Sequence, residues 1–233
     1  MRYTKQKIRL LPLLVTSILI PFLGAAQVVQ PEREMINRLD SNDLKQGAWI
    51  TPWNNTIPRT VEYFEDGERN GPIYHLSYSG QLKAQENYKA NQRHGIQLTY
   101  SIAGHVVEEK NYYMGALDGR QVKFHTNGKR SSLENYHRGI KNGESSWYYE
   151  SGNLSTRFNY EEGLLNGMAE DFYDNGMIKS QTEYVNNLKQ GNYTRYYENR
   201  QVKEQGQYMA GEKAGIWKYY TETGSLEKEE KFK

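Results

Sequence analysis

Cysteine is absent from the 233 residues of the sequence. Its absence excludes disulfide scaffolds, thiolate catalysis, cysteine-based zinc sites and a lipid-modified N-terminal cysteine. Aliphatic residues are also scarce, because hydrophobic residues make up only 36% of the chain and aromatics, at 13% of the chain, supply over a third of them. Most aromatics are the 20 tyrosines, whose rings pack while their hydroxyls stay in water. The composition therefore argues against an ordinary aliphatic core.

The one long apolar run lies near the N-terminus. Basic residues between Arg2 and Arg9 precede the apolar run Leu10–Leu23, and the small residues Gly24-Ala25-Ala26 follow it. This order is typical of a secretory signal peptide, and the run is short for a membrane span, which needs about 20 apolar residues. We expect residues 1–26 to be cleaved near Ala26, so that the protein is exported (periplasmic or secreted) with no transmembrane span. An uncleaved anchor is the alternative.

An excess of either charge is missing too. The chain has 30 Lys and Arg against 28 Asp and Glu, for a net charge of +2, and removing the four basic residues of the leader takes it to −2. Nucleic-acid-binding domains carry a marked positive footprint. The charge balance therefore excludes nucleic acid as a partner.

The dominant feature of the sequence is a period of 24 residues, which three interlocked series carry without insertion or deletion. The first series is Gly47, Gly71, Gly95, Gly119, Gly143, Gly167, Gly191 and Gly215. The second is Gly80, Gly104, Gly128, Gly152, Gly176, Arg200 and Gly224. The third is Phe64, Tyr88, Tyr112, Tyr136, Tyr160, Tyr184, Tyr208 and Phe232. A fixed period of this length indicates a repeat architecture.

The pattern predicts that each 24-residue unit forms one β-hairpin. Segments rich in aromatic strand formers, such as Ser146-Trp147-Tyr148-Tyr149, run into turn signals, and a second strand follows. A three-residue loop with glycine in the left-handed position places Phe172 opposite Ile178 on one face. We expect a second turn at Lys141-Asn142-Gly143 and its equivalents. A bulky residue at positive φ costs about 1 kcal/mol, so Arg200 predicts a locally altered turn.

The unit G-x-W/Y-x-x-Y-Y-x-x-G-x-L-x-x-x-x-x-Y-x-x-G-x-x-x-G resembles the MORN-repeat variant found in bacterial proteins of the YwqK antitoxin-like family. The nearest copies are Gly143–Asn166, Gly191–Ala214 and Gly215–Lys233, and the resemblance covers residues 71–233 clearly and 47–70 in degraded form. It implies an all-β fold, an elongated antiparallel β-meander of β-hairpin (MORN-like) repeats that acts as an interaction module.

The sequence therefore predicts three parts. Residues 1–26 form the signal peptide, residues 27–46 a linker or short cap, and residues 47–233 a MORN-like repeat array with units starting at 47, 71, 95, 119, 143, 167, 191 and 215. The pattern around Met35, Ile36 and Leu39 permits one short helix. The array implies about 15 strands of β-meander, with the repeat tyrosines forming a ladder on one face, each near the glycine that opens the next strand. Charges between Glu227 and Lys231 suit protection of the last strand edge from other chains.

Recognisable catalytic motifs are absent from the sequence. The five histidines, at positions 75, 94, 105, 125 and 137, occupy five different places in the repeat and match no ligand pattern. There is no H-E-x-x-H, P-loop, G-x-S-x-G or dinucleotide fingerprint. We therefore predict no enzyme activity, no catalytic residue, no cofactor and no metal site.

The face opposite the tyrosine ladder supplies the candidate binding residues. That face is polar in the units that start at Gly95 and Gly119 and becomes aromatic in later units. Exposed aromatic surface marks binding sites; burial by sheet curvature or by another layer is the alternative. The candidates are Trp147, Tyr149, Tyr173, Tyr193, Tyr197, Trp217 and Tyr219.

Three functions are compatible with this pattern. The leading one is a non-enzymatic exported scaffold that mediates protein–protein interaction with an unknown protein partner along this face. A second is carbohydrate or cell-wall polysaccharide binding, because the Trp147-Tyr148-Tyr149 segment is similar to the core of choline- and glucan-binding repeats, whose aromatic rings stack on sugars or cage a quaternary amine. A third is an antitoxin-like protein of the YwqK type, whose cytoplasmic partner the signal peptide contradicts.

Overall fold

The computed structural model describes residues 36–233, and no helix occurs among them. The predicted short helix is wrong for its described part, because Ile36 forms a β-bridge with Ala48 and the next residues enter a strand. The Oδ1 atom of Asp40 then accepts hydrogen bonds from the backbone N–H groups of Asn42 and Leu44, at 2.8 and 3.0 Å. Such a side-chain bond favours a turn over a helix. Met35 and the predicted signal peptide lie outside the described residues.

The chain divides into two compact units. Of the described residues, unit 1 comprises residues 36–94 together with Tyr100–Gly104, and unit 2 comprises Gly95–Thr99 and His105–Lys233, so the division falls within β8 (Gly95–Tyr100). The strands of unit 1 are β1 (Arg38–Leu39), β2 (Lys45–Pro52), β3 (Pro58–Glu65), β4 (Glu68–Arg69), β5 (Gly71–Leu76), β6 (Leu82–Lys89) and β7 (Gln92–Arg93).

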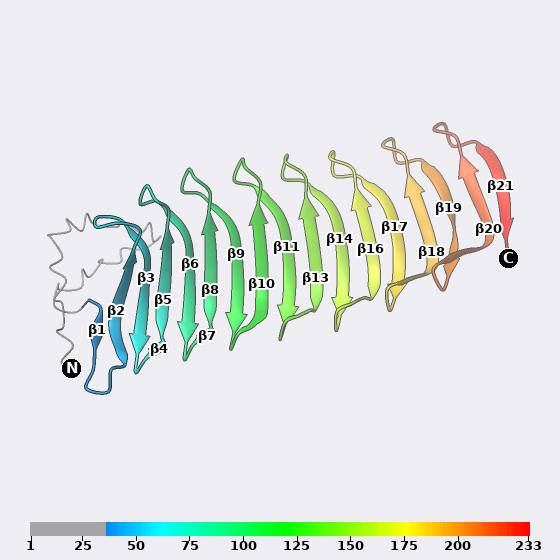
Figure 1. The fold of residues 1–233 in the computed structure, drawn as a ribbon. Helices are drawn as coiled ribbons and strands as arrows, with labels where there is room; N and C mark the ends of the chain where they lie inside the picture. The colour runs from blue at the N-terminus through cyan, green and yellow to red at the C-terminus, as the bar shows by residue number, and fades with distance from the viewer. Residues whose placement is uncertain (1–35) are drawn as a thin grey trace. The chain divides into compact units, whose positions relative to one another are not determined.

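Unit 2 contains the larger number of strands. These are β9 (Val106–Tyr113), β10 (Ala116–Phe124), β11 (Arg130–His137), β12 (Ile140–Lys141), β13 (Gly143–Tyr148), β14 (Leu154–Glu161), β15 (Leu164–Leu165), β16 (Gly167–Phe172), β17 (Ile178–Val185), β18 (Leu188–Tyr196), β19 (Val202–Met209), β20 (Glu212–Tyr220) and β21 (Leu226–Phe232). Within each unit, neighbouring strands of the sheet pair antiparallel (Figure 1). Strands β3, β11 and β14 each pair both with the short strand that follows and with the longer strand after it. The all-β class and the antiparallel meander of hairpins are confirmed.

The predicted three-residue loop is confirmed as well. Phe172 pairs with Ile178, and the N–H of Tyr173 donates to the carbonyl of Met177 at 2.8 Å. Between them, Gly176 adopts a φ of 82°, the left-handed conformation that glycine adopts without steric cost. Turn chemistry therefore sets the register of each hairpin.

The turn at Arg200 keeps the same geometry as its glycine equivalents, so the predicted alteration is wrong. Arg200 adopts a φ of 70°, and its N–H donates to the carbonyl of Tyr197 at 3.0 Å, as Gly176 does to Tyr173 at 2.9 Å. The hydrogen bonds of the loop hold Arg200 in a conformation that L-residues rarely adopt.

A β-bulge follows each of these loops. Phe172 pairs with Ile178 but Asp171 pairs with Ser180, so Lys179 is an extra residue in the second strand. Such a residue changes the face on which the rest of the strand presents its side chains. As a result Tyr184 lies opposite Gly167, the glycine that opens its own hairpin. On its other side Tyr184 pairs with Lys189, and Gly191 lies against Glu183, so the prediction that each repeat tyrosine lies near the glycine of the next strand is wrong.

The second turn of each 24-residue repeat lies three residues earlier than predicted. Arg138 and Gly139 form it with φ values of 49° and 85°, and Tyr136 then pairs with Lys141. The register breaks at Gly143, whose φ is 91°, and β13 pairs with β11 beyond that break. Breaks of this kind divide several strands in two, so the structure has 21 strands among the described residues, against about 15 expected.

The ladder face is the side of each hairpin that bears the repeat tyrosines and phenylalanines of the third series. Cross-strand partners share a face, so Ser145, Trp147 and their partners Phe158 and Thr156 belong to the ladder face together with Tyr160. Much of the burial in unit 2 lies here, since Ser145 and Trp217 are 0% exposed.

Candidate interaction surfaces

Four of the seven candidate binding residues lie on the ladder face, not opposite it. Tyr193 packs edge-on against Tyr208, with ring centroids 5.6 Å apart. Trp147, Trp217 and Tyr219 occupy strand positions with the same pairing pattern. The prediction that these residues face away from the tyrosine ladder is therefore wrong. Its physical cause is the bulge, which turns each repeat tyrosine to the side of the first-strand aromatics.

Trp217 is a core residue. It is 0% exposed, and its ring lies over Gly206, where a built Cβ atom would come within 2.4 Å of it. Its centroid is 5.1 Å from that of Tyr208 and 5.5 Å from that of Tyr193. Because no part of its side chain reaches solvent, Trp217 cannot act as an exposed contact residue in this structure.

The burial around Trp217 also affects Tyr193. Burial, and then the nearby carboxylate of Glu204, raise the pKa of Tyr193 to about 12. Both factors oppose formation of the charged tyrosinate. The Tyr193 hydroxyl is therefore protonated over the whole physiological range and serves as a hydrogen-bond donor to Glu204, at 3.4 Å.

Lysine side chains lie over the aromatic rings of the ladder face. The Nζ atom of Lys213 is 3.9 Å from the centroid of Trp217 and 5.3 Å from that of Tyr219. Lys141 lies 5.6 Å from Trp147 in the same way, and Lys189 and Lys45 repeat the arrangement in their own hairpins. These cation–π contacts place a positive charge of the chain itself against the rings that a quaternary amine would otherwise approach.

The sequence contains a signal for these lysines that the prediction missed. A basic residue stands two positions before most of the repeat glycines, at Lys45, Arg69, Arg93, Lys141, Lys189 and Lys213. Read from the sequence, such charges suggest a solvated edge. The structure shows instead that the charged groups of Lys45, Arg69, Lys141, Lys189 and Lys213 lie over rings of the ladder face.

The other three candidate residues connect neighbouring hairpins. The hydroxyl groups of Tyr149, Tyr173 and Tyr197 each donate to a backbone carbonyl 23 residues later, with distances of 2.7, 2.7 and 2.9 Å. In unit 1 the indole Nε1 of Trp53 donates to the carbonyl of Leu76 at 3.0 Å. We call these bonds repeat clasps. The polar atoms of these side chains are thus already used within the fold.

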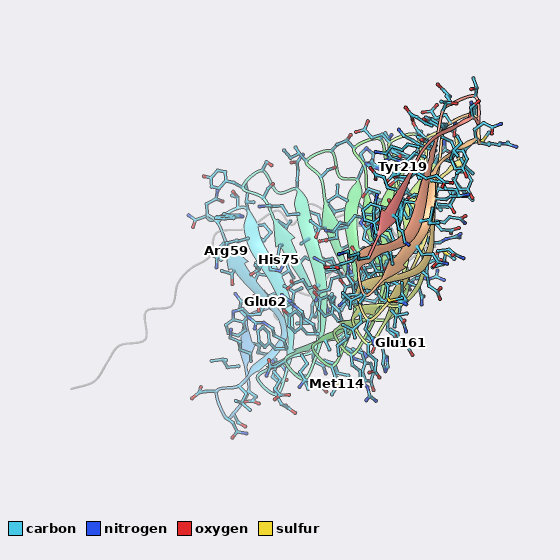
Figure 2. The ribbon with its side chains drawn as sticks, turned by 90° about the vertical axis from the view of Figure 1, so that its right-hand side faces the viewer. Arg59, Glu62, His75, Met114, Glu161 and Tyr219 are labelled. Atoms are coloured by element: carbon cyan, nitrogen blue, oxygen red, sulfur yellow. The ribbon has the colours of Figure 1, made fainter. Side chains whose placement is uncertain are left out.

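The loops of unit 1 carry the most exposed aromatic group, which the sequence prediction did not select. Trp53 is 45% exposed and Tyr78 is 66% exposed, and their ring centroids lie 6.2 Å apart. The guanidinium carbon of Arg59, labelled in Figure 2, lies 5.7 Å from the Trp53 centroid. We call Trp53, Arg59 and Tyr78 the aromatic loop cluster. Tryptophan, tyrosine and arginine are the residues that most often dominate binding energy at protein interfaces.

Four of the five loops of unit 2 carry an acidic residue at the position of Tyr78. Counted from the opening glycine of each repeat, the position of Tyr78 is occupied in unit 1 also by Asn54 and by Ile102, which is 89% exposed. In unit 2 the same position holds Thr126 and the exposed acidic residues Glu150, Asp174, Glu198 and Glu222. Two loops of unit 1 therefore expose a large apolar residue at a position where most loops of unit 2 expose an acid.

Exposed aliphatic residues line the opposite, turn end of the hairpins in unit 2. Ile140, Leu164 and Leu188 are 51%, 40% and 50% exposed. Each follows a two-residue turn, and a Cβ built on Gly163 would lie 3.1 Å from the Cγ2 of Ile140. These side chains therefore reach toward the turn of the next hairpin and leave apolar surface in water.

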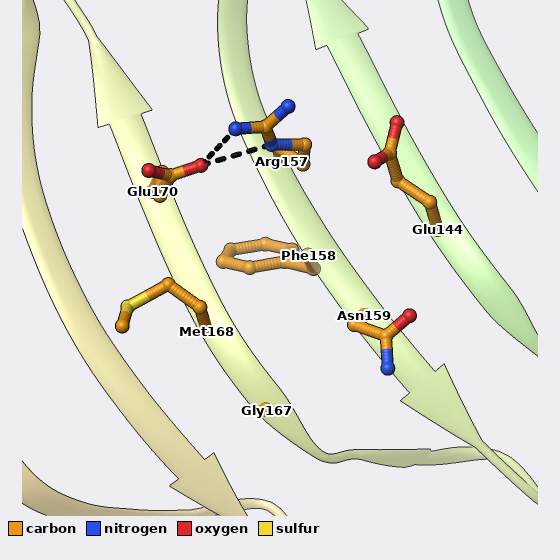
Figure 3. Close-up of a pocket in the computed structure, with 7 residues that line it drawn as sticks. All are labelled: Glu144, Arg157, Phe158, Asn159, Gly167, Met168 and Glu170. Carbon is orange, nitrogen blue, oxygen red and sulfur yellow. Dashed lines mark hydrogen bonds and ion pairs between the residues drawn. The ribbon is translucent and has the colours of Figure 1, made fainter.

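A shallow pocket of about 280 Å³ lies between β14 and β16 in unit 2 (Figure 3). It is lined by Glu144, Arg157, Phe158, Asn159, Gly167, Met168 and Glu170. Arg157 donates to Glu170 from Nε, at 2.9 Å, and from its terminal nitrogen. Burial disfavours the charge on Glu170, but the hydrogen bonds from Arg157 and Gln181 hold its pKa below the usual value. The arginine of the pocket is therefore already paired within it.

Residues 141–162, 165–186 and 213–233 match a family model described as the MORN repeat variant. The chain carries variant MORN repeats. No curated protein matches the chain. The matched MORN repeats correspond to the hairpins that begin at Gly143, Gly167 and Gly215.

The match confirms the MORN repeat variant in three repeats and refines the prediction of which copies are nearest to it. Of the three copies predicted as nearest to the MORN repeat variant, those at Gly143 and Gly215 are matched, whereas the copy at Gly191 is not and the copy at Gly167 is. The Gly191 copy carries Arg200 where the matched MORN repeats carry a turn glycine. MORN repeats are in general involved in interactions with proteins and membranes.

Two further observations concern only residues 36–233. No helix in this part of the MORN-repeat chain has the length and apolar character needed to cross a bilayer. No three His, Asp or Glu side chains in the same part gather at a point where they could ligate a metal ion.

Proposed function

We propose that the protein is an exported, non-enzymatic scaffold that binds a protein partner through the aromatic loop cluster of unit 1. The observation that carries the proposal is the exposed Trp53–Tyr78 pair, with ring centroids 6.2 Å apart and Arg59 beside it. Large apolar groups left in water on a folded protein mark interaction sites.

The cluster is held in place before any partner arrives. The repeat clasp from Trp53 to the carbonyl of Leu76 fixes the indole, and the Arg59 guanidinium lies beside that ring. Side chains that are already ordered lose little conformational entropy on binding. The cluster therefore has the composition and rigidity of an interface anchor.

The ladder face supports binding less directly. Trp217 is buried, and lysines of the chain cover the rings of Trp147 and Tyr193. A role in binding for the half-buried candidates stays a prediction; these are Trp147, Tyr149, Tyr173, Tyr193, Tyr197 and Tyr219.

Export is the second part of the proposal, and it rests on the sequence of residues 1–26. The experiment is fractionation of the producing cells followed by N-terminal sequencing of the protein. We expect a mature chain that begins near Gln27 outside the cytoplasm. A full-length chain in the cytoplasm would reject export and would favour the antitoxin-like role.

Site-specific photo-crosslinking tests the binding surface. A photoreactive amino acid replaces Tyr78 in one variant and Glu150, at the same loop position in unit 2, in the matched control. We expect a protein crosslink from position 78 at least ten times stronger than from position 150, and its loss when Trp53→Ala is added. Equal crosslinking from the two positions would reject the aromatic loop cluster as the binding site.

Trp53→Phe separates two roles of the indole, because phenylalanine keeps a ring but cannot donate the clasp hydrogen bond. Retained crosslinking in Trp53→Phe is expected if the ring makes the contact. Pelleting with purified peptidoglycan and glucans forms the last arm. If the protein pellets with a polysaccharide and Trp53→Ala abolishes this, the partner is a carbohydrate and the proposal of a protein partner fails.

A further inference from the structure

The apolar surface of the aromatic loop cluster continues into a third loop of unit 1. Tyr78 and Ile102 stand at the same position of successive hairpins, and the segment Tyr100–Gly104, which carries Ile102, belongs to unit 1. Trp53 lies in the loop of the preceding hairpin, one residue earlier in the repeat. All of these side chains are exposed. Three successive loops of unit 1 therefore each present one large apolar side chain to solvent.

The spacing of these loops matches one regular peptide conformation. Neighbouring strands lie about 4.8 Å apart, so equivalent positions of successive hairpins, which are two strands apart, recur about every 9.6 Å. A polyproline II helix has three residues per turn and rises about 3.1 Å per residue, so it returns to the same side after about 9.3 Å. A β-strand returns after about 6.6 Å and an α-helix after about 5.4 Å. A peptide in the polyproline II conformation that crosses the loops therefore places one turn on each loop.

The polar groups beside the rings suit such a peptide. Proline has no N–H, so a proline-rich chain offers backbone carbonyl oxygens as acceptors and few backbone donors. The hydroxyl of Tyr78 and the guanidinium of Arg59 can donate hydrogen bonds to those oxygens. These three loops contain no acidic residue between the strands that they connect. Arg59 and Lys83, at equivalent positions after two of the loops, are exposed, so the charge beside the rings favours a peptide with acidic residues.

The loops are also ordered before a peptide arrives. The side chain of Asn54 accepts a hydrogen bond from the N–H of Thr56 at 2.9 Å, and that of Ser77 accepts one from the N–H of Gln81 at 3.1 Å. Such bonds hold a loop in a turn conformation. A polyproline II segment is likewise preformed in water. Because both sides are ordered, their association costs little conformational entropy.

We propose that the surface formed by Trp53, Tyr78 and Ile102 binds a proline-rich segment of the protein partner in the polyproline II conformation. One side of the peptide lies on these three side chains, and an acidic residue next to its prolines pairs with Arg59. This inference rests on the proposed function, because it names the chemistry of the partner at the same cluster and adds Ile102 to the site.

Binding of synthetic peptides to the purified protein tests the inference. The probe is a fluorescent decaproline peptide that carries one glutamate at its end. Its mirror image, made of D-amino acids, is the matched control, because it has the same composition and the opposite helical hand. We expect fluorescence anisotropy to give a dissociation constant at least ten times lower for the L-peptide. Absence of binding, equal binding of the two forms, or tighter binding of an amphipathic α-helical peptide would overturn the inference.

Substitutions locate the bound peptide. Tyr78→Ala and Ile102→Ser should each raise the dissociation constant of the L-peptide at least five times, because each removes one apolar contact. Ile140→Ser, at an exposed aliphatic residue of unit 2, is the control and should leave the constant unchanged. Equal effects of all three substitutions would place the peptide elsewhere and overturn the inference. Circular dichroism of each variant excludes loss of fold as the cause.

A charge exchange tests the contact with Arg59. Arg59→Glu should weaken binding of the glutamate peptide at least three times and strengthen binding of the same peptide with lysine in place of glutamate. Loss of binding to both peptides, or no change with either, would reject this contact.

The crosslinking experiment separates failure of this inference from failure of the proposed function. A protein crosslink from position 78 that excess L-peptide does not reduce means that the cluster binds its partner through other chemistry. In that case the inference fails and the proposed function stands. Absence of both the crosslink and peptide binding would overturn the two together.

Discussion

The hairpins that begin at Gly143 and Gly191 fill the same position on the ladder face with an aromatic ring from opposite strands. In the first, Ser145 is the cross-strand partner of Phe158; in the second, Tyr193 is the partner of Gly206. Each pair combines one ring with one small residue, but the ring sits on a different strand. In these two hairpins the pair on the ladder face keeps one ring and one small residue whichever strand supplies the ring, because interiors must be filled at close packing.

The two hairpins differ in how their neighbours use the small residue. Gly206 leaves room that Trp217, from the following hairpin, fills completely. Ser145 is as fully buried as Trp217, but its hydroxyl has no hydrogen-bond partner among the described residues. The C-terminal end of unit 2 is therefore built as an aromatic core, whereas the middle of the unit buries small and polar groups.

Trp217→Ala should cause the largest loss of stability among the substitutions considered. Removing a fully buried tryptophan costs about 3–5 kcal/mol in the free energy of unfolding. Trp147→Ala, in the hairpin that begins at Gly143, removes a half-buried ring and should cost clearly less. Urea unfolding followed by circular dichroism measures both. Equal losses would show that the aromatic end of unit 2 is no more cohesive than its middle.

Gly206→Ala tests whether the glycine is needed for space. An added Cβ would lie 2.4 Å from the ring of Trp217, and such overpacking costs about 1–3 kcal/mol. The same substitution in the Trp217→Ala background should cost little, because the clashing ring is gone. The coupling between the two substitutions is the quantity to measure. Additive effects would mean that Gly206 has another role.

Arg200→Gly should stabilise the hairpin that begins at Gly191, by about 1 kcal/mol, because glycine adopts the observed φ of 70° without the steric cost that arginine bears. Arg200→Ala is the control, since alanine keeps the strained conformation but loses the contact of the arginine Nε with the Met177 sulfur. We expect the melting temperature of the Arg200→Gly variant to be higher than those of the unmodified protein and of the Arg200→Ala variant. A drop with glycine would show that the contact outweighs the strain.

The ionisation of Tyr193 should have no effect at neutral pH and a small one in alkali. Its pKa is raised from 10.0 to about 12, so its contribution to stability is complete below pH 10 and is lost as the pH rises through about 12. Tyr193→Phe should reduce the fall in melting temperature between pH 10 and 12, and Tyr78→Phe, which removes an exposed tyrosine, should not. Identical alkaline melting curves for the two variants would contradict this assignment.

The sequence was sufficient to predict the period, the hairpins and the three-residue loop, because local turn chemistry sets each of them. It was not sufficient to assign the faces. Lys179 looks like any other strand residue, yet it is the bulge that moves Tyr184 to the other side. Because the prediction did not include this extra residue, it placed four of the seven candidate aromatics on the wrong face.

The candidate surface was harder to find for a different reason. Trp53 and Tyr78 stand in loop positions, where sequence reasoning looks for turn formers instead of binding groups. Their proximity depends on two loops one repeat apart, which no local pattern reveals. The lysines over the rings were missed because their side chains fold back across the sheet, and sequence alone gives no such direction.

The repeat clasps have a consequence for how such a chain can change by duplication. Each tyrosine clasp spans 23 residues and ends at the same place in the next hairpin. Copying or deleting one whole unit of 24 residues joins the tyrosine of one hairpin to an equivalent carbonyl in its new neighbour. Gaining or losing a single residue inside a unit would leave that hydroxyl without its acceptor. The length of the array is thus free to vary in whole units, while the length of each unit is held fixed.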